Sequence, residues 1–508
     1  MKGGASEKFP LTLADVTQSK LGRVEYPFLL RVADVKNVFS CWIPDLQDLF
    51  KGDGLGRDGT ALAAFFLLVI GVLLGGASRQ HELRLALVEL AALPLLVLAV
   101  TALLRVESIS AHRFALCIWG CVLLLPLMQL LPLPPSIWTR LPGREPLTLA
   151  LDVLNLQAGW LPLSLTPDKT WRSFLALLPP VAMFLGVLAV APLVRVRLVQ
   201  LIVLAAAVSI LLGAAQLASG NEGLYPWATT SSGSVTGFFA NRNHLASLCL
   251  LGLPYAAVAG AASLRRRHSA SNLPLWLSIL YIALAIVALG VIRSRAGIVL
   301  FGPVFAASLL AAWVAAGRGR PKPLLLGLAA AAALAVAAVG AFALGPLVAR
   351  FENGTSTEGR FENWPTVIQA AETHLPLGSG LGSFDAVYRS VEPLSRLDAT
   401  YFNQAHNDYL ETLLEAGWPG IALIVAFLFW FARRSWAAWC AEVSTQRDLQ
   451  RAATIAIGVL LVHSTADYPL RTATMAMIFA LSCGLLELAV RSDAKLNPKR
   501  TSQRKRVR

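Results

Sequence analysis

Charged residues are scarce in this chain of 508 residues: 15% are Asp, Glu, Lys or Arg, whereas 56% are hydrophobic. Soluble globular domains carry about 25% charged residues. The mean hydropathy of +0.60 points the same way. The shortage of charge excludes an ordinary soluble domain as the body of the fold, and we predict an integral membrane protein.

Cysteine is also scarce, and no disulfide framework is predicted. Small extracellular domains that depend on disulfides carry closely spaced cysteines in their polar segments. Here the cysteines fall in or beside apolar segments or in the leading segment, where they are read as small apolar side chains. They are Cys41, Cys117, Cys121, Cys249, Cys440 and Cys483.

Two further patterns are missing from the chain. Residues 1–58 lack a continuous apolar core, so they are read as neither a signal peptide nor a span. A small cap, a surface-lying segment and disorder with local helix all stay open for them. The two halves of the chain show no repeat of the kind that many transporters have, which makes a transporter the distant alternative.

Long apolar segments fill most of the remaining sequence. A helix needs about 20 apolar residues to cross the hydrocarbon core of a bilayer. We therefore predict an all-α integral membrane fold of about twelve transmembrane helices, with re-entrant geometry open for one or two. The segments are 61–77, 85–104, 114–131, 173–191, 198–218, 245–263, 274–292, 297–316, 324–344, 418–432, 452–467 and 472–490.

The basic residues set the orientation of these spans. The net charge of +14 comes largely from short Lys and Arg runs between apolar segments, such as 265–267 and 433–434, and from the tail 492–508. This pattern is typical of cytoplasmic anchoring beside anionic lipid rather than of nucleic-acid binding. With both ends inside, the membrane domain 59–491 places the long connections 132–172, 219–244 and 345–417 on its outer face.

Several arginines on the predicted outer face run against that charge bias. An arginine at a membrane boundary is costly unless it is paired, anchored in lipid or functional. Single residues of this kind can be explained by snorkelling, but several on one face favour an anionic ligand. Arg295, in a tight turn between two spans, could present two donors to a phosphate. The set is Arg242, Arg293, Arg295, Arg360 and Arg471.

A polar cluster precedes the span that begins near residue 245. Asn241 or Asn243 can cap that helix, but capping does not explain the whole cluster, so Asn241, Arg242 and Asn243 are candidate substrate-binding residues. His244 is read as a hydrogen-bonded structural histidine, with a ligand or base as the sharper alternative.

The 132–172 and 345–417 connections differ in what they predict. Repeated prolines in the first forbid a regular helix, and it is either a lid that docks an acceptor or a mere connection. The second contains a short amphipathic helix from Gly359 to Ala371 that carries Arg360 and Trp364. The glycines at 378–382 follow no strand and lack the lysine of a phosphate loop, so we expect a tight turn or a close approach by a glycan.

His406 stands just before a predicted helix. Asp408 and Glu411 could form a capping box there, and a helix N-terminus favours the neutral imidazole that can take a proton. Asn407, Glu411 and Glu415 share one helical face by their spacing of four and could bind sugar hydroxyls. His406, Asp408 and the residues around them show no tight metal-ligand spacing, so we expect neither a metal nor another cofactor.

These motifs, in this order, resemble those of the O-antigen ligase superfamily of bacterial inner-membrane proteins, which also holds Wzy-type polymerases and O-linked oligosaccharyltransferases. The resemblance covers roughly residues 126–486 and leaves the leading segment without a counterpart. The motifs are Gly237–His244, Ser294–Gly297, Arg360 with Trp364, the glycines at 378–382, His406–Tyr409 with Glu415–Gly417, and His463–Leu470.

The resemblance implies a multi-pass glycosyltransferase of the C-type (GT-C-like) fold whose active face is periplasmic, with the large loop 345–417 between spans nine and ten. The donor it implies is an undecaprenyl-pyrophosphate-linked glycan. Arg295 and Arg360 would hold the pyrophosphate, and His406 would take a proton from the acceptor hydroxyl. The acceptor, a lipid A core for a ligase or another lipid-linked glycan for a polymerase, stays open.

Overall fold

The computed structural model describes residues 55–77, 82–105, 107–220, 222–227, 234–265, 272–317, 358–396 and 402–488. All of them belong to the larger of two compact units, Gly52–Arg508. The leading segment up to residue 54, the expected span 324–344 and the tail 492–508 lie outside the described residues.

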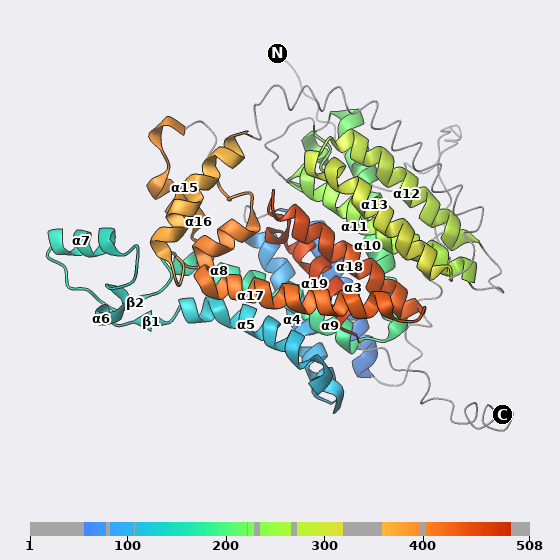
Figure 1. Ribbon diagram of the computed structural model, residues 1–508, viewed down its shortest axis with the longest axis horizontal. Helices are drawn as coiled ribbons and strands as arrows, with labels where there is room; N and C mark the ends of the chain where they lie inside the picture. Colours follow the sequence, from blue (N-terminus) through green and yellow to red (C-terminus); the bar gives the residue numbers. More distant parts are fainter. Residues whose placement is uncertain are drawn as a thin grey trace, which may run out of the picture. The chain divides into compact units, whose positions relative to one another are not determined.

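The described chain is almost entirely α-helical (Figure 1). Its longer helices are α3 (Leu55–Leu74), α4 (Glu82–Leu104), α5 (Arg113–Gln129), α8 (Pro167–Ala176), α9 (Leu178–Ala189), α10 (Pro192–Ser219), α11 (Arg242–Arg265), α12 (Leu273–Ile292), α13 (Arg295–Ala315), α15 (Glu358–His374), α17 (Asp408–Cys440), α18 (Thr445–His463) and α19 (Ala473–Glu487). The shorter elements are η1 (Glu107–His112), β1 (Pro132–Leu133), α6 (Pro135–Trp138), α7 (Glu145–Val153), β2 (Leu161–Pro162), η2 (Glu222–Leu224), α16 (Phe384–Val391), η3 (Leu394–Arg396) and η4 (Pro469–Arg471).

Within the described residues, eight helices are long and apolar enough to cross a membrane. They coincide with eight of the expected spans, and two shorter apolar helices, 59–74 and 473–487, coincide with the first and the last. Helix α18 covers most of the expected span 452–467. The helical membrane architecture is therefore confirmed, while the total number of crossings stays a prediction.

Helix α11 is the most deeply buried of the candidate spans, with 89% of its apolar window inside the protein. It packs against α10, α12, α13 and α18, and Figure 1 shows α11, α12 and α13 side by side. Glycines allow this close packing: a Cβ on Gly252 would lie 2.0 Å from the Tyr281 hydroxyl, and one on Gly260 would lie 2.9 Å from Ser278. Close packing against α12 therefore holds α11 in the centre of the bundle.

The loop 132–172 differs from its expected form. It contains the two-residue strands β1 and β2, which pair antiparallel, and the short helices α6 and α7. The expectation that its prolines forbid regular helix was wrong because Pro135, Pro146 and Pro167 occupy the first turns of α6, α7 and α8, where a missing N–H costs nothing.

The polar connections expected on one face do meet at one end of the bundle. Thr474 N donates to Gly75 O at 3.2 Å, and Ala240 N donates to Gly76 O at 3.2 Å. Arg84 at the start of α4 packs over the Trp227 ring, 4.7 Å from its centroid. The described residues that follow α3, α10 and α18 therefore contact one another at this end of the bundle.

At the other end of the bundle, ion pairs join the ends of neighbouring helices. Glu487 at the end of α19 accepts a hydrogen bond from Arg434 Nε at 2.8 Å, and His112 Nδ1 lies 3.0 Å from the same carboxylate. Asp448 at the start of α18 pairs with Arg265 at 2.9 Å. These basic residues lie at the end that the charge bias assigns to the cytoplasm.

Candidate functional site

Asp467, in the turn between α18 and α19, is the centre of the polar site. The carboxylate is fully buried. Its Oδ2 atom accepts hydrogen bonds from the Asn243 amide at 2.7 Å and from the Asn241 amide at 3.5 Å. Its Oδ1 atom lies 3.2 Å from His406 Nδ1. One carboxylate therefore joins the polar cluster before α11 to the segment before α17.

The hydrogen bonds of Asp467 fix the tautomer of His406. Burial alone raises the pKa of the Asp467 carboxyl, but the hydrogen bond with His406 and the electrostatic interactions with this and the neighbouring histidines outweigh burial and hold that pKa well below its usual range. An ionised carboxylate can only accept hydrogen bonds. His406 must therefore donate through Nδ1–H, which leaves the lone pair on Nε2 able to take a proton.

The His406 ring is held between two aromatic rings. The ring centroid of Tyr468 lies 4.8 Å away and that of Phe402 lies 5.7 Å away, and 13% of the His406 side chain is exposed. The backbone of His406 has φ of 50°, a conformation that non-glycine residues seldom adopt. Such backbone strain occurs often at functional sites, where the surroundings hold the residue in place.

Asn243 carries the network from Asp467 to the turn that holds Arg295. The Asn243 amide oxygen accepts a hydrogen bond from Ser294 Oγ at 2.8 Å. Ser294 is also the N-cap of α13, because its Oγ accepts from Gly297 N at 3.2 Å. Arg295 is the first residue of α13 and is partly exposed. Arg295 therefore follows directly after Ser294, which is linked through Asn243 to Asp467.

Helix α15 contributes to the site through Trp364. The indole Nε1 of Trp364 donates to the carbonyl of Ala405 at 3.0 Å, one residue before His406. Arg360 lies in the first turn of α15, four residues before Trp364. The structure describes the backbone at Arg360 but not its side chain, so the predicted role of that guanidinium rests on its place in the helix.

The predicted capping box at α17 was wrong in its members. Asn407 is the N-cap: its amide oxygen accepts from Tyr409 N at 3.0 Å and from Leu410 N at 3.1 Å. Glu411 instead accepts from Ala405 N at 3.0 Å. Asparagine before Asp408 wins because its oxygen reaches the free N–H groups of the first turn from an extended backbone.

Arg471 binds three carboxylates of α17. Its guanidinium lies 3.0 Å from Glu415 and 3.4 Å from both Asp408 and Glu411. Burial alone lowers the pKa of Arg471, but the three carboxylates outweigh burial and raise it above the ordinary value. Arg471 is therefore engaged inside the protein, and the other arginines of the set are the candidates for the predicted anionic ligand.

Four predicted sugar-binding side chains have internal partners instead. Glu411 and Glu415 have no exposed surface, and Glu415 Oε1 accepts from Gly382 N at 2.9 Å and from Phe384 N at 3.2 Å. Both ends of the Asn243 amide are bonded within the protein, and Asn407 is a helix cap. These groups build the walls of the site, and their direct contact with sugar stays a prediction.

The remaining predicted residues have definite places. Asn241 is the cap of α11, since its Oδ1 accepts from Asn243 N at 2.8 Å. Arg242 donates to Ser234 Oγ at 3.4 Å. Asp408 accepts from Ser464 Oγ at 2.7 Å in addition to its pairing with Arg471. The expected capping of α11 by an asparagine is confirmed by Asn241.

The glycines at 378–382 form the tight turn expected of them. Gly378, Gly380 and Gly382 all have positive φ, and a Cβ on Gly380 would lie 2.3 Å from Ser164 Oγ. Gln129 at the end of α5 holds the turn, because it accepts from Leu381 N and donates to the Glu415 carbonyl, both at 2.9 Å. The turn is packed against protein rather than open to a ligand.

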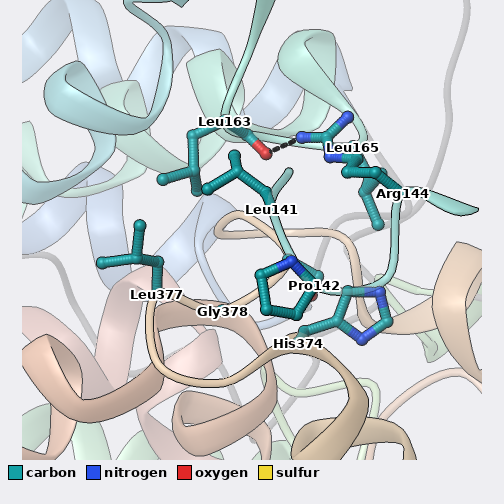
Figure 2. A pocket seen from close by; sticks show the side chains of 9 residues that line it. Leu141, Pro142, Arg144, Leu163, Leu165, His374, Leu377 and Gly378 are labelled. Carbon is teal, nitrogen blue, oxygen red and sulfur yellow. Dashed lines mark hydrogen bonds between the residues drawn. The ribbon is translucent and has the colours of Figure 1, made fainter. Parts of the chain in front are cut away.

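A small pocket lies beside this turn, and Figure 2 shows the side chains that line it. Its polar side chains hydrogen-bond within the protein. Arg144 points at the carbonyl of Leu163, to which it donates. His374 Nδ1 lies 2.8 Å from the carbonyl of Ala370. The pocket is lined by Leu141, Pro142, Arg144, Leu163, Leu165, His374, Leu377, Gly378 and Ser379. The pocket therefore lies between the loop 132–172 and the segment from the end of α15 to Ser379.

Asp467 is the main residue of the candidate site that sequence reasoning missed. It stands in the motif His463–Leu470 that carried the resemblance, but its partners lie 61 and 224 residues away in the chain. A carboxylate in a short polar turn between two apolar helices was the available signal. Across the described ranges, no three His, Cys, Asp or Glu side chains gather as metal ligands would, and metal independence stays a prediction.

The fold and the site together define a class: a polytopic membrane protein with a buried carboxylate–imidazole pair and an arginine at one end of its helix bundle. Residues 280–425 match the family model described as O-antigen ligase. This match confirms the resemblance to the O-antigen ligase and Wzy superfamily and supports a ligase- or polymerase-type function. The comparison with curated proteins gave no match.

The matched stretch contains Arg295, Arg360 and His406. Asn243 and Asp467 lie outside it, and the structure rather than the family match joins them to His406. The family is one of glycosyltransferase-like enzymes whose substrates are lipid-linked glycans and polysaccharides.

Proposed function

We propose that the protein transfers a glycan from an undecaprenyl-pyrophosphate carrier to an acceptor hydroxyl at the periplasmic face of the bacterial inner membrane, as an O-antigen ligase does in the assembly of cell-surface polysaccharide. The observation that carries the proposal is the contact of His406 Nδ1 with the buried Asp467 carboxylate. The same carboxylate binds Asn243, which holds the turn before Arg295.

His406 acts as the general base. With Nδ1–H directed at Asp467, Nε2 is the ring nitrogen that takes the proton of the attacking hydroxyl, and the adjacent carboxylate stabilises the imidazolium that forms. The acceptor oxygen bonds to the anomeric carbon while the bond from that carbon to the phosphate oxygen breaks. The proton on His406 then passes to solvent or to the released diphosphate.

Arg295 and Arg360 bind the diphosphate. A guanidinium presents paired donors that match phosphate oxygens, and its fixed charge stabilises the negative charge that grows on the leaving group. Residues three or four apart share one side of a helix, so position 360 faces the same way as Trp364, whose indole bonds next to His406. The two arginines belong to different helices, α13 and α15.

The site also suits a donor whose lipid tail stays in the bilayer. Its residues come from the outer ends of α11, α13 and α17, and these three helices are candidate membrane spans. A polyprenyl chain can therefore lie along the spans while its diphosphate reaches the polar end of the bundle. No nucleotide sugar is needed, because the lipid diphosphate is itself the leaving group.

The test is product analysis with the purified protein in lipid nanodiscs, supplied with an undecaprenyl-diphosphate glycan. Transfer to a lipid A core, with release of undecaprenyl diphosphate, supports the ligase. Lengthening of the lipid-linked glycan instead assigns the Wzy-type polymerase reaction. Absence of both products, or solute transport that survives His406→Ala, overturns the transferase proposal.

A further inference from the structure

The segment 234–241, which leads into α11, is non-helical backbone buried in the helix bundle. Thr236 and Phe239 are fully buried, and Val235 is 6% exposed. Buried peptide groups without hydrogen bonds cost several kcal/mol each where no water reaches them. Their partners therefore have to come from the protein.

Gln216, near the end of α10, supplies several of these partners. Its Oε1 atom accepts from Gly237 N at 2.9 Å, from Thr236 N at 3.1 Å and from Thr236 Oγ1 at 3.4 Å. Its Nε2 atom donates to the carbonyl of Gly237 at 3.0 Å and to that of Leu224 at 3.1 Å. Gln216 is 1% exposed, so this buried side-chain amide makes its hydrogen bonds to the segment and to Leu224.

Further contacts hold the same segment from α10 itself and from the residues that follow α3. Ser209 Oγ on α10 accepts from Phe238 N at 3.1 Å, and a Cβ on Gly237 would lie 2.2 Å from that oxygen. A Cβ on Gly76 would lie 2.0 Å from the carbonyl of Phe238. The backbone at 236–238 therefore has little room to move as long as its hydrogen bonds are intact.

The segment delivers two side chains to the site. Asn241 is its last residue and Asn243 lies in the first turn of α11, and both donate to the Asp467 carboxylate that contacts His406. A shift of the segment would rotate these amides away from Asp467. The carboxylate would then lose the donors that hold its orientation toward the imidazole.

We propose that Gln216 is a positioning residue for the transfer reaction: its amide fixes the backbone at 236–238 and, through Asn241 and Asn243, the alignment of Asp467 with His406. The predicted effect of Gln216 on turnover rests on the proposed function, whereas its predicted effect on the backbone at 236–238 does not. Gln216 touches neither the base nor the substrate.

The experiment compares Gln216→Met with Gln200→Met, the same change nearer the other end of α10. Hydrogen exchange of the peptides covering 234–241 is measured beside kcat and KM for a lipid-diphosphate glycan. In Gln216→Met we expect faster exchange at 236–238 and a fall in kcat of about 10- to 100-fold, with KM for the donor changed less than about threefold because Arg295 and Arg360 are untouched. Gln200→Met should leave both readouts at the wild-type level.

Gln216→Glu provides a second variant, because its carboxylate keeps the acceptor for Thr236 N and Gly237 N while losing the two donated bonds. Its exchange and kcat should fall between those of the wild type and Gln216→Met. Unchanged exchange at 236–238 in Gln216→Met overturns the inference, as does an equal loss of kcat in Gln200→Met. Absence of transfer by the wild type overturns the proposed function instead, because the exchange comparison does not depend on activity.

Discussion

The Nδ1 atom of His406 lies 3.2 Å from Oδ1 of Asp467, although 61 residues separate them in the chain. The contact gives the imidazole one defined tautomer and directs Nε2 away from the carboxylate. It also links the end of the large outer loop to the turn between the last two helices.

Asp467→Asn tests this contact directly. Asparagine keeps the size of the side chain, but its amide can donate to Nδ1 and so favour the wrong tautomer of His406. We expect kcat to fall by about 10³-fold or more, as in other carboxylate–imidazole pairs. Initial rates with a lipid-diphosphate glycan give the measurement. Asp385→Asn, in an ion pair with Lys169, is the control and should stay near the wild-type rate; a variant at position 467 with more than half the wild-type kcat contradicts the assignment.

Arg360→Lys tests the role of the first turn of α15. Lysine keeps the charge but loses the paired donors that match a diphosphate, so we expect kcat/KM to fall by about 10²–10³-fold. The matched control is Arg389→Lys, on α16, where the guanidinium pairs with Asp385 on an exposed surface. Near-normal kcat/KM in Arg360→Lys would mean that this arginine contributes only diffuse charge.

The pH dependence of stability tests the Asp467 centre in another way. Because its pKa is depressed in the folded protein, the carboxylate contributes stability above the ordinary aspartate pKa of about 4, and this contribution is lost as pH falls through the depressed value. The Tm difference between the wild type and Asp467→Asn should therefore hold from pH 8 to pH 5 and shrink in more acidic buffer. A Tm difference that disappears between pH 7 and pH 6 would mean that a group other than the Asp467 carboxylate causes it.

Gly380→Ala tests the turn that supports α17. The backbone at Gly380 has φ of 105°, and the new methyl group would press on Ser164, so we expect a loss of about 1–3 kcal/mol in the free energy of unfolding. Thermal unfolding in detergent measures it. Gly458→Ala, in α18 with no atom within 4 Å of the added Cβ, should be neutral or slightly stabilising. Equal Tm values for the two variants would contradict the packing described for the turn.

Sequence alone predicted the helices well because a span is a local property. The apolar segments 85–104 and 274–292 reappear as α4 and α12 with ends shifted by at most a few residues. The helix that carries Trp364 and the turn at Gly380 were also predicted, since helical periodicity and glycine spacing are read within a few residues.

The site was only partly predictable because its contacts join distant segments. Asp467, Asn243 and His406 meet through tertiary packing, which no local pattern encodes. Glu411 and Glu415 looked like free acceptors because their partner Arg471 is 56 residues or more further along the chain. Gln216 gave a faint signal as a side-chain amide near the end of an apolar helix, and its hydrogen bonds became visible only with the fold.

The central claim is that a lipid diphosphate binds between the arginines of α13 and α15 on the side of His406 Nε2. The most direct measurement is a cryo-EM map of the protein in nanodiscs with an undecaprenyl-diphosphate glycan bound. We predict diphosphate density within hydrogen-bond reach of both Arg295 and Arg360, with the anomeric carbon facing His406. Density at another end of the bundle, or the two guanidinium groups on opposite sides of the donor's path, would contradict the account.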